Sequence, residues 1–350
     1  MTVSRALRGD RSIPPATRAK IRAEADALGY RPNPMVSALM ARLRATRTPS
    51  YQATLAWLND HPEPSPWRKV PYMRPYFEGA RERAESLGYR LEEISLPTEN
   101  PDDIDSHVTQ ARRILSARGM PGLVLPLNYR PSMTRRDWSG FAVAVLGRHK
   151  KNTDYSVPGH RPDPMPHGVS EDYFFNMRLA CRSLRALGYR RIGWVSNPWF
   201  DAVTDSLYPA AFAQEQTEWP EAERLPPFLL PGLARPDTAP PPGFAQWIRR
   251  QRPDVLLGRF VELADWARAL DLGARAPDLA HLGLAADVKG WSGIDPQFRE
   301  LGAAAIDLVA AQLARNERDT PVHPKEVLIR GTWVAGRSTR ASALSGQPRH

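Results

Sequence analysis

Short apolar segments alternate with amphipathic helical segments between about residues 50 and 330, and this alternation narrows the possible folds more than any other feature. The predicted strands are 54–58, 90–96, 122–127, 141–146, 191–196, 228–230, 255–257, 280–285 and 326–330. The predicted helices are 76–87, 104–118, 173–187, 202–216, 244–251, 262–271 and 298–315. Such alternation is typical of parallel α/β sheets. It restarts after the proline-rich loop 158–166, which predicts two similar lobes with a small-molecule site between them.

Positive charge is concentrated at the beginning of the chain. Residues 1–50 contain ten arginines and lysines against three acidic residues, a net charge of +7, and the other 300 residues contribute only +3. A basic, helical segment is the electrostatic signature of a nucleic-acid-binding module, because neutralising phosphates releases counterions. An arginine-rich solvated surface explains the charge of this segment equally well.

Several functional classes find no support in the sequence. No apolar stretch reaches membrane-spanning length, and no secretory signal core is present, so a cytoplasmic protein without membrane association is expected. The single cysteine, Cys181, lies among apolar residues and predicts a buried structural thiol. His160 and His167 lack partners at metal-ligand spacing, and neither a phosphate-binding glycine loop nor a nucleophile elbow occurs. We therefore expect no enzymatic activity, catalytic residue, metal or cofactor.

The first fifty residues predict three short helices. Thr2-Val3-Ser4-Arg5-Ala6-Leu7 reads as one helix closed by Gly9, and 15–28 as a second closed by Gly29. Asn33 is a good N-cap and Pro34 a good first helical residue, so a third helix is expected from Pro34 to about Leu43.

This N-terminal segment resembles the headpiece of the LacI/GalR family of bacterial transcriptional regulators. The resemblance rests on Thr2 to Leu7, Thr17-Arg18 and the run Leu28-Gly29-Tyr30-Arg31-Pro32-Asn33, and it extends into the α/β part. There it is carried by the segments Leu187-Gly188-Tyr189-Arg190-Arg191-Ile192-Gly193, Arg252-Pro253-Asp254-Val255 and Gly302-Ala303-Ala304-Ala305. The resemblance implies an α/β, two-lobed, periplasmic-binding-protein-like (type I) sensor domain, preceded by a small all-α, partial helix-turn-helix headpiece and a hinge helix.

The resemblance also implies function and partners. A homodimer is expected to bind a palindromic operator DNA as a repressor of carbohydrate-related genes, in response to a saccharide or related effector. The DNA-binding residues implied are Thr2, Ser4, Arg5, Arg18, Tyr30, Asn33 and Leu39. Leu39 matches the leucine that the family wedges into a minor-groove base step, and the alternative for Leu39 is an ordinary helix face packed on the lobe below.

The headpiece departs from the family pattern at its start. Family headpieces have a helix and a turn before the recognition helix, whereas here only Met1 precedes Thr2. One hypothesis is a reading frame that begins about twenty codons upstream, the length of one helix plus a turn. The alternative is a truncated, DNA-binding-deficient sugar sensor of the same fold.

Effector-binding candidates are polar residues at the carboxyl ends of the predicted strands. They are Asp60, His61, Arg148, Asp172, Arg259, Asp287 and Trp291. Carboxylates and arginine pair with sugar hydroxyls, and tryptophan offers a flat apolar face. For each residue, a loop salt bridge or a surface aromatic is an equal alternative. Gly258-Arg259 stands where many sugar-binding members have Asn-Asp, so the effector is expected to be unusual or anionic, or absent.

The expected domain boundaries follow from these patterns. Residues 1–32 form the partial helix-turn-helix domain, 33–50 the hinge helix and linker, and 51–337 the effector-binding and dimerisation domain. Lobe 1 is expected at about 51–150 and 288–318, lobe 2 at about 151–287 and 319–337, and a disordered tail at 338–350.

Overall fold

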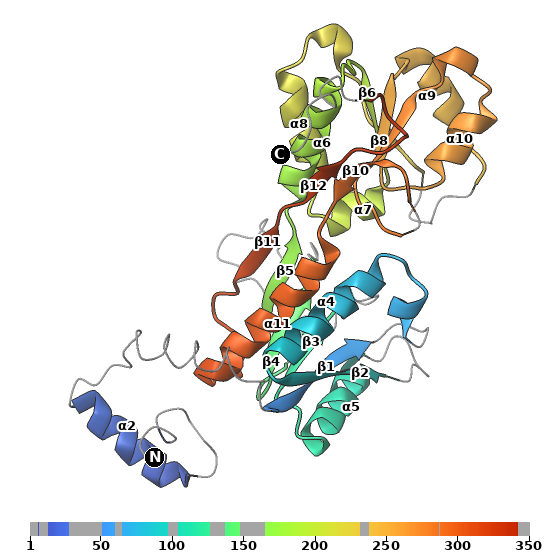
Figure 1. Ribbon diagram of the computed structural model, residues 1–350. Coiled ribbons are helices and arrows are strands. Elements are labelled where there is room, and N and C mark those ends of the chain that lie inside the picture. Colours follow the sequence, from blue (N-terminus) through green and yellow to red (C-terminus); the bar gives the residue numbers. More distant parts are fainter. Residues whose placement is uncertain are drawn as a thin grey trace, which may run out of the picture.

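The computed structural model describes residue 6 and residues 13–27, 51–59, 65–96, 104–126, 137–147, 165–231, 238–286 and 288–341. From residue 51 onward these residues form two α/β lobes, one above the other in Figure 1. The expected two-lobed α/β fold is confirmed. One further helix, α2 (Pro15–Ala27), covers the predicted helix 15–28, and the other headpiece and hinge elements lie outside the described residues.

Lobe 1 is built on a six-stranded sheet in the order β11-β5-β4-β3-β1-β2, in which every neighbouring pair is parallel. Its strands are β1 (Ala53–Asn59), β2 (Tyr89–Ser95), β3 (Gly122–Leu125), β4 (Ala142–Leu146), β5 (His167–Glu171) and β11 (Glu326–Ile329). Its helices are the 3-10 turn η1 (Pro66–Arg68), α4 (Met73–Ser86), α5 (Ile104–Ala117) and α11 (Phe298–Arg315).

Lobe 2 repeats this plan with the order β12-β10-β9-β8-β6-β7, and only its edge strand β12 is antiparallel. Its strands are β6 (Ile192–Ser196), β7 (Phe228–Leu229), β8 (Val255–Gly258), β9 (Asp278–His281), β10 (Ser292–Asp295) and β12 (Thr332–Val334). Its helices are α6 (Tyr173–Ala186), α7 (Pro198–Val203), α8 (Leu207–Thr217), η4 (Glu221–Glu223), α9 (Phe244–Gln251), α10 (Leu263–Ala269) and η5 (Gly273–Arg275).

Helices cover both faces of each sheet, as expected for parallel strands that are apolar on both sides. In lobe 1, β1 sends Leu55 and Trp57 to one face and Ala56 and Leu58 to the other, and all four are buried. In lobe 2, helices α6 and α8 lie on one side of the sheet and α9 and α10 on the other (Figure 1). Cys181 is buried in α6, as predicted, and burial raises the pKa of its thiol.

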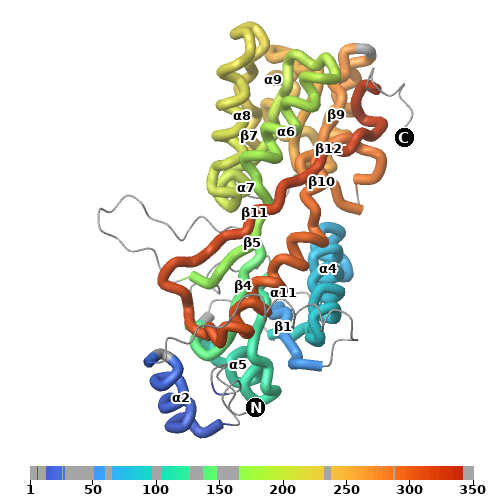
Figure 2. Tube along the Cα trace, turned by 60° about the vertical axis from the view of Figure 1, so that its left-hand side comes forward, coloured from blue at the N-terminus to red at the C-terminus, as the bar shows by residue number. Residues whose placement is uncertain are grey.

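The chain crosses between the lobes three times. It passes from β5 to α6 at 171–173, from β10 to α11 at 295–298, and from β11 to β12 at 329–332. Figure 2 shows the third crossing as a nearly straight run from one lobe into the other. The first and third crossings are joined by a hydrogen bond from the Asp172 N–H to the Ile329 carbonyl, 2.9 Å long. Three adjacent connections of this kind form a hinge region.

These crossings revise the expected lobe boundaries. Strands β5 and β11 belong to the sheet of lobe 1, and β10 belongs to the sheet of lobe 2. Residues 167–171 and 326–329 were expected in lobe 2, and 292–295 in lobe 1. The strands β5, β10 and β12 were not predicted: β5 and β10 each carry a single large apolar side chain, and β12 has only three residues.

The predicted single helix 202–216 is also wrong. The structure has two helices, α7 and α8, separated at Asp205 and Ser206, which adopt positive φ angles of 56° and 53°. Left-handed backbone ends a helix, because it breaks the pattern of intrahelical hydrogen bonds.

Two glycines allow α4 and α11 to pack backbone against backbone in lobe 1. A Cβ atom on Gly302 would stand 2.0 Å from the Tyr76 carbonyl oxygen, and one on Gly79 would stand 2.1 Å from the Arg299 carbonyl oxygen. Side-chain rearrangement cannot relieve either clash, because both obstacles are backbone atoms. The position of α4, and with it that of Tyr76, therefore depends on these glycines.

Replacing Gly302 by alanine should lower the free energy of unfolding by more than 2 kcal/mol, the scale of overpacking in a close-packed core. In a solvent-exposed helix the same change would stabilise by about 1 kcal/mol. Chemical denaturation measures the difference, with the exposed Ala314→Ser in the same helix as the control. A stability equal to or above that of the wild type would contradict the close approach of the two helices.

Candidate functional site

A buried ion pair joins the two lobes. Nη1 of Arg259 lies 3.2 Å and 3.1 Å from the two carboxylate oxygens of Glu171 and also donates to the Tyr208 hydroxyl at 3.4 Å. The Glu171 side chain is only 4% exposed and that of Arg259 is 18% exposed. Breaking a buried pair by removing one partner costs about 3–5 kcal/mol. This contact is therefore a major link between the lobes.

The topology explains why these two residues meet. Glu171 is the last residue of β5 in lobe 1, and Arg259 directly follows β8 in lobe 2. Loops at the carboxyl ends of parallel strands form the binding crevice in open α/β folds. The pair therefore lies where this class of fold places its ligands.

The Arg259 guanidinium is also held by lobe 2 itself. Its Cζ atom lies 5.1 Å from the ring centroid of Phe200 on α7, within the range of a cation–π contact. On another side it approaches Gly283, where a Cβ atom would be 2.7 Å from Cζ and Nη2. Only a glycine leaves room for the guanidinium in this position.

Three buried tyrosines surround the ion pair. Tyr76 comes from α4 of lobe 1, whereas Tyr173 and Tyr208 come from α6 and α8 of lobe 2. The ring centroids of Tyr173 and Tyr208 are 5.3 Å apart, and Phe200 stacks on Tyr208 at 5.4 Å. Burial, reinforced by the nearby Glu171 charge, raises the pKa of all three tyrosines. They are neutral at physiological pH and present aromatic faces and hydroxyl groups to the site.

Burial also shifts the other titratable groups of the site. It raises the pKa of Glu171 above its ordinary value, although Arg259 and a hydrogen bond from Tyr208 favour the charged form. It lowers the pKa of His281, at the end of β9, to about 3, and the Arg259 charge acts in the same direction. His281 is therefore neutral, and its Nδ1 accepts a hydrogen bond from the Gly283 N–H at 3.1 Å. The formal charges of the described site are those of Glu171 and Arg259.

The structure brings one of the predicted effector residues, Arg259, into the centre of this site. Asp172 instead caps α6, its Oδ1 accepting from the Phe175 N–H at 3.0 Å, and its Oδ2 pairs with Arg330 at 3.4 Å. Trp291 is half-buried and packs edge-on against His281, with ring centroids 5.9 Å apart. The other four candidates, Asp60, His61, Arg148 and Asp287, lie outside the described residues.

Sequence reasoning missed Glu171 and the three tyrosines. Glu171 immediately precedes Asp172, but it becomes a candidate only once 167–171 is recognised as a strand. The tyrosines look like ordinary helical core residues in the sequence, and only the approach of the two lobes brings them to one place.

Among the predicted DNA-binding residues, Arg18 lies in a described segment, on the half-buried side of α2. Thr2, Ser4, Arg5, Tyr30, Asn33 and Leu39 lie outside the described residues. Their DNA contacts remain predictions.

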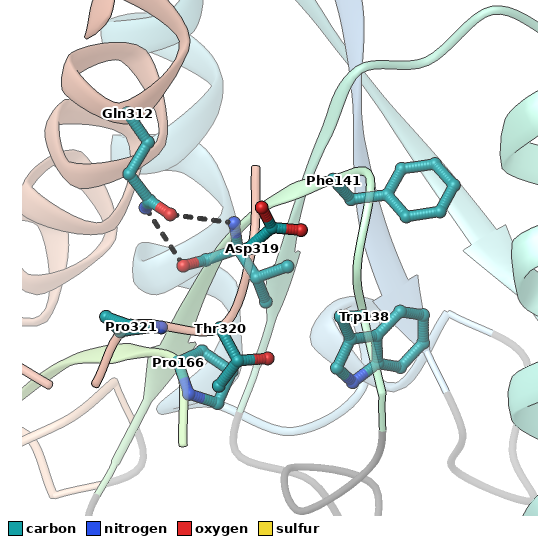
Figure 3. A pocket seen from close by; sticks show the side chains of 8 residues that line it. Trp138, Phe141, Pro166, Gln312, Asp319, Thr320 and Pro321 are labelled. Atoms are coloured by element: carbon teal, nitrogen blue, oxygen red, sulfur yellow. Dashed lines mark hydrogen bonds between the residues drawn. The ribbon is translucent and has the colours of Figure 1, made fainter. Parts of the chain in front are cut away.

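A small hollow lies away from the ion pair, at the edge of lobe 1 (Figure 3). Its lining includes Trp138, Phe141 and Gln312, and it has no room for a water molecule. The Gln312 amide bonds both the N–H and the carbonyl of Val143, at 3.3 Å and 3.0 Å, at the point where neighbouring β5 has not yet begun. Ligand pockets are usually 300–1,000 Å³. The glutamine completes the sheet here, and the hollow is too small for a typical effector.

Other kinds of site find no support in the described part of the chain. Its histidine, cysteine and acidic residues form no group of three that could hold a metal ion. None of its helices is both long enough and apolar enough to span a membrane.

The fold is similar to solved structures of transcriptional regulators. The Lac repressor dimer bound to operator and the anti-inducer ONPF matches at a TM-score of 0.54 and 17% identity, over 97% of this chain and 95% of that chain. The regulator CelR in complex with cellobiose matches at 0.55 and 14% identity, over 96% and 94%. The chain has the fold of LacI-type regulators.

A further similar structure corresponds to a smaller share of this chain. A periplasmic binding protein/LacI transcriptional regulator from Alkaliphilus metalliredigens QYMF, complexed with D-xylulofuranose, has a TM-score of 0.54 and 14% identity. It covers 82% of this chain and 99% of its own. No family model matches the sequence, and no curated protein matches it. At these identities the likeness establishes the fold.

Replacing Arg259 by methionine should destabilise the protein more at pH 8 than at pH 5. Without the guanidinium the buried Glu171 has a still higher pKa, so it is neutral at low pH, and stability is lost as the pH rises through that pKa. We expect a loss of about 3–5 kcal/mol at pH 8 and a smaller loss at pH 5.

Urea unfolding at the two pH values measures the effect. The double variant R259M/E171Q is the control and should lose the extra pH dependence. An R259M deficit that is the same at pH 5 and pH 8 would show that Glu171 and Arg259 are not coupled.

Proposed function

We propose that the protein is a ligand-responsive transcriptional regulator of the LacI/GalR type. It binds a palindromic operator as a homodimer and represses genes concerned with carbohydrates. The observation that carries this proposal is the match of the fold over nearly the whole chain to an operator-bound repressor, together with the basic headpiece-like run from Thr2 to Asn33.

The interlobe site supports the sensory part of this function. Its charged pair and aromatic rings come from both lobes, so a ligand bound there changes how the lobes sit on each other. In the solved relatives the ligands include cellobiose and D-xylulofuranose. A saccharide or saccharide derivative is the corresponding effector class here, and the aromatic faces suit a sugar ring.

The three interlobe crossings provide a route from the effector site towards the DNA-binding segment. Asp172 directly follows Glu171, and its N–H is hydrogen-bonded to Ile329, where the third crossing begins. A movement of the ion pair is therefore transmitted to both the first and the third crossing. Lobe 1 follows the headpiece in the chain and carries β1, its first strand. A change in lobe angle thereby alters the spacing of the two headpieces in a dimer. The proposed regulatory role depends on binding and involves no catalysis.

Binding-site selection from random duplexes tests DNA recognition with the full chain. We expect a two-fold symmetric consensus bound by a dimer, with an affinity that falls steeply between 50 and 200 mM salt, because phosphate contacts release counterions. Analytical ultracentrifugation should give twice the mass of the chain. If the protein binds a ligand but selects no DNA sequence, the result supports the alternative, a DNA-binding-deficient sensor.

Replacing Arg5 by alanine should weaken binding to the selected operator about tenfold or more, because a base-contacting arginine contributes about 1–3 kcal/mol of discrimination. The matched control is Arg249→Ala on the exposed side of α9, which removes the same charge from a helix of lobe 2. Fluorescence anisotropy measures both affinities. Equal losses of affinity in the two variants would indicate a general effect of charge and would contradict a base contact by Arg5.

A further inference from the structure

We propose that the effector carries an anionic group, a carboxylate or a phosphate, which takes the place of the Glu171 carboxylate on Arg259. This inference rests on the proposed function, because it names the ligand class of the same interlobe site. In the structure the protein supplies its own carboxylate to the guanidinium, across the boundary between the lobes.

The position of Arg259 depends largely on lobe 2. Phe200 and Tyr208 contact it, and the absence of a side chain at Gly283 makes room for it. The carboxylate that pairs with the guanidinium, in contrast, comes from Glu171 of lobe 1. When the lobes separate, the guanidinium stays on lobe 2 and loses its carboxylate. A guanidinium held in this way is a preformed receptor for a carboxylate or a phosphate, which it can bind through two donors.

The energetics favour an anionic ligand over a neutral one. A neutral ligand that enters between Arg259 and Glu171 leaves the guanidinium without its counterion in a largely buried place, at a cost of several kcal/mol. An anionic ligand replaces the lost interaction with an equivalent one. The surrounding tyrosines can donate hydroxyl hydrogen bonds to the same group. Glu171 therefore acts as an internal competitor that a ligand must displace.

Isothermal titration calorimetry on the full chain tests the proposal with D-glucuronate, D-glucose 6-phosphate and neutral D-glucose at constant ionic strength. We expect one or both of the anionic sugars to bind and glucose to bind at least tenfold more weakly. The two anionic probes separate a carboxylate from a phosphate. Equal binding of glucose and the anionic sugars, or no binding of either anion, would overturn the proposal.

Substitutions locate the binding at the ion pair. Glu171→Gln removes the competing carboxylate and should strengthen anion binding at least tenfold, whereas Glu221→Gln, the same change on an exposed turn of lobe 2, should have no effect. Gly283→Ala displaces the guanidinium without a change in charge and should weaken anion binding, so it tests the proposal independently of E171Q. Unchanged affinity in both E171Q and G283A would overturn the proposal.

Operator binding measured in parallel separates the two claims. If the operator is bound but no anion binds, the anionic effector is refuted and the regulator stands. If anions bind at Arg259 but no operator is recognised, the regulator is refuted and the anion site stands.

Discussion

The ion pair between Glu171 and Arg259 is the interaction on which the relation of the two lobes depends. Each lobe has its own sheet and its own apolar clusters, so each is stabilised largely from within. The lobes are joined by the three chain crossings and by contacts that include the Glu171 carboxylate and the Arg259 guanidinium, both largely removed from water. A buried pair of opposite charges is expensive to break, because each charge is then left uncompensated in a place that water does not reach. That property suits the ligand-responsive role that we propose for the protein.

The close packing of α4 on α11 supports this contact from lobe 1. Gly79 and Gly302 bring the two helices together, and the carbonyl oxygen beside Gly302 belongs to Tyr76. Burial raises the pKa of the Tyr76 hydroxyl, and Glu171 lies close enough for its charge to raise that pKa further. Because α11 directly follows the second interlobe crossing, a shift at the hinge changes the surroundings of the ion pair.

Much of the fold could be predicted from the sequence because strands such as 54–58 and 255–257 are continuous apolar runs. The strands that the sequence did not reveal, β5, β10 and β12, each lie next to a crossing. Strand β5 reads His-Gly-Val-Ser-Glu and β10 reads Ser-Gly-Ile-Asp, since residues near a hinge make polar contacts as well as apolar ones. Arg259 could be predicted because it directly follows an evident strand. Glu171 could not, because its strand was hidden, and Tyr76, Tyr173 and Tyr208 come together only in three dimensions.

The distance between the lobes provides the most direct test of the central claim that the Glu171–Arg259 pair holds them together. Spin labels on cysteines introduced at Glu85 of α4 and Arg249 of α9, both exposed, report this distance by pulsed electron resonance, and the buried Cys181 stays unlabelled. With labelled protein diluted in an excess of unlabelled protein, so that only distances within one chain are measured, one narrow distance distribution is expected in the otherwise unchanged protein. A broader, longer distribution is expected when Arg259 is replaced by methionine. Identical distributions in the two proteins would contradict the claim.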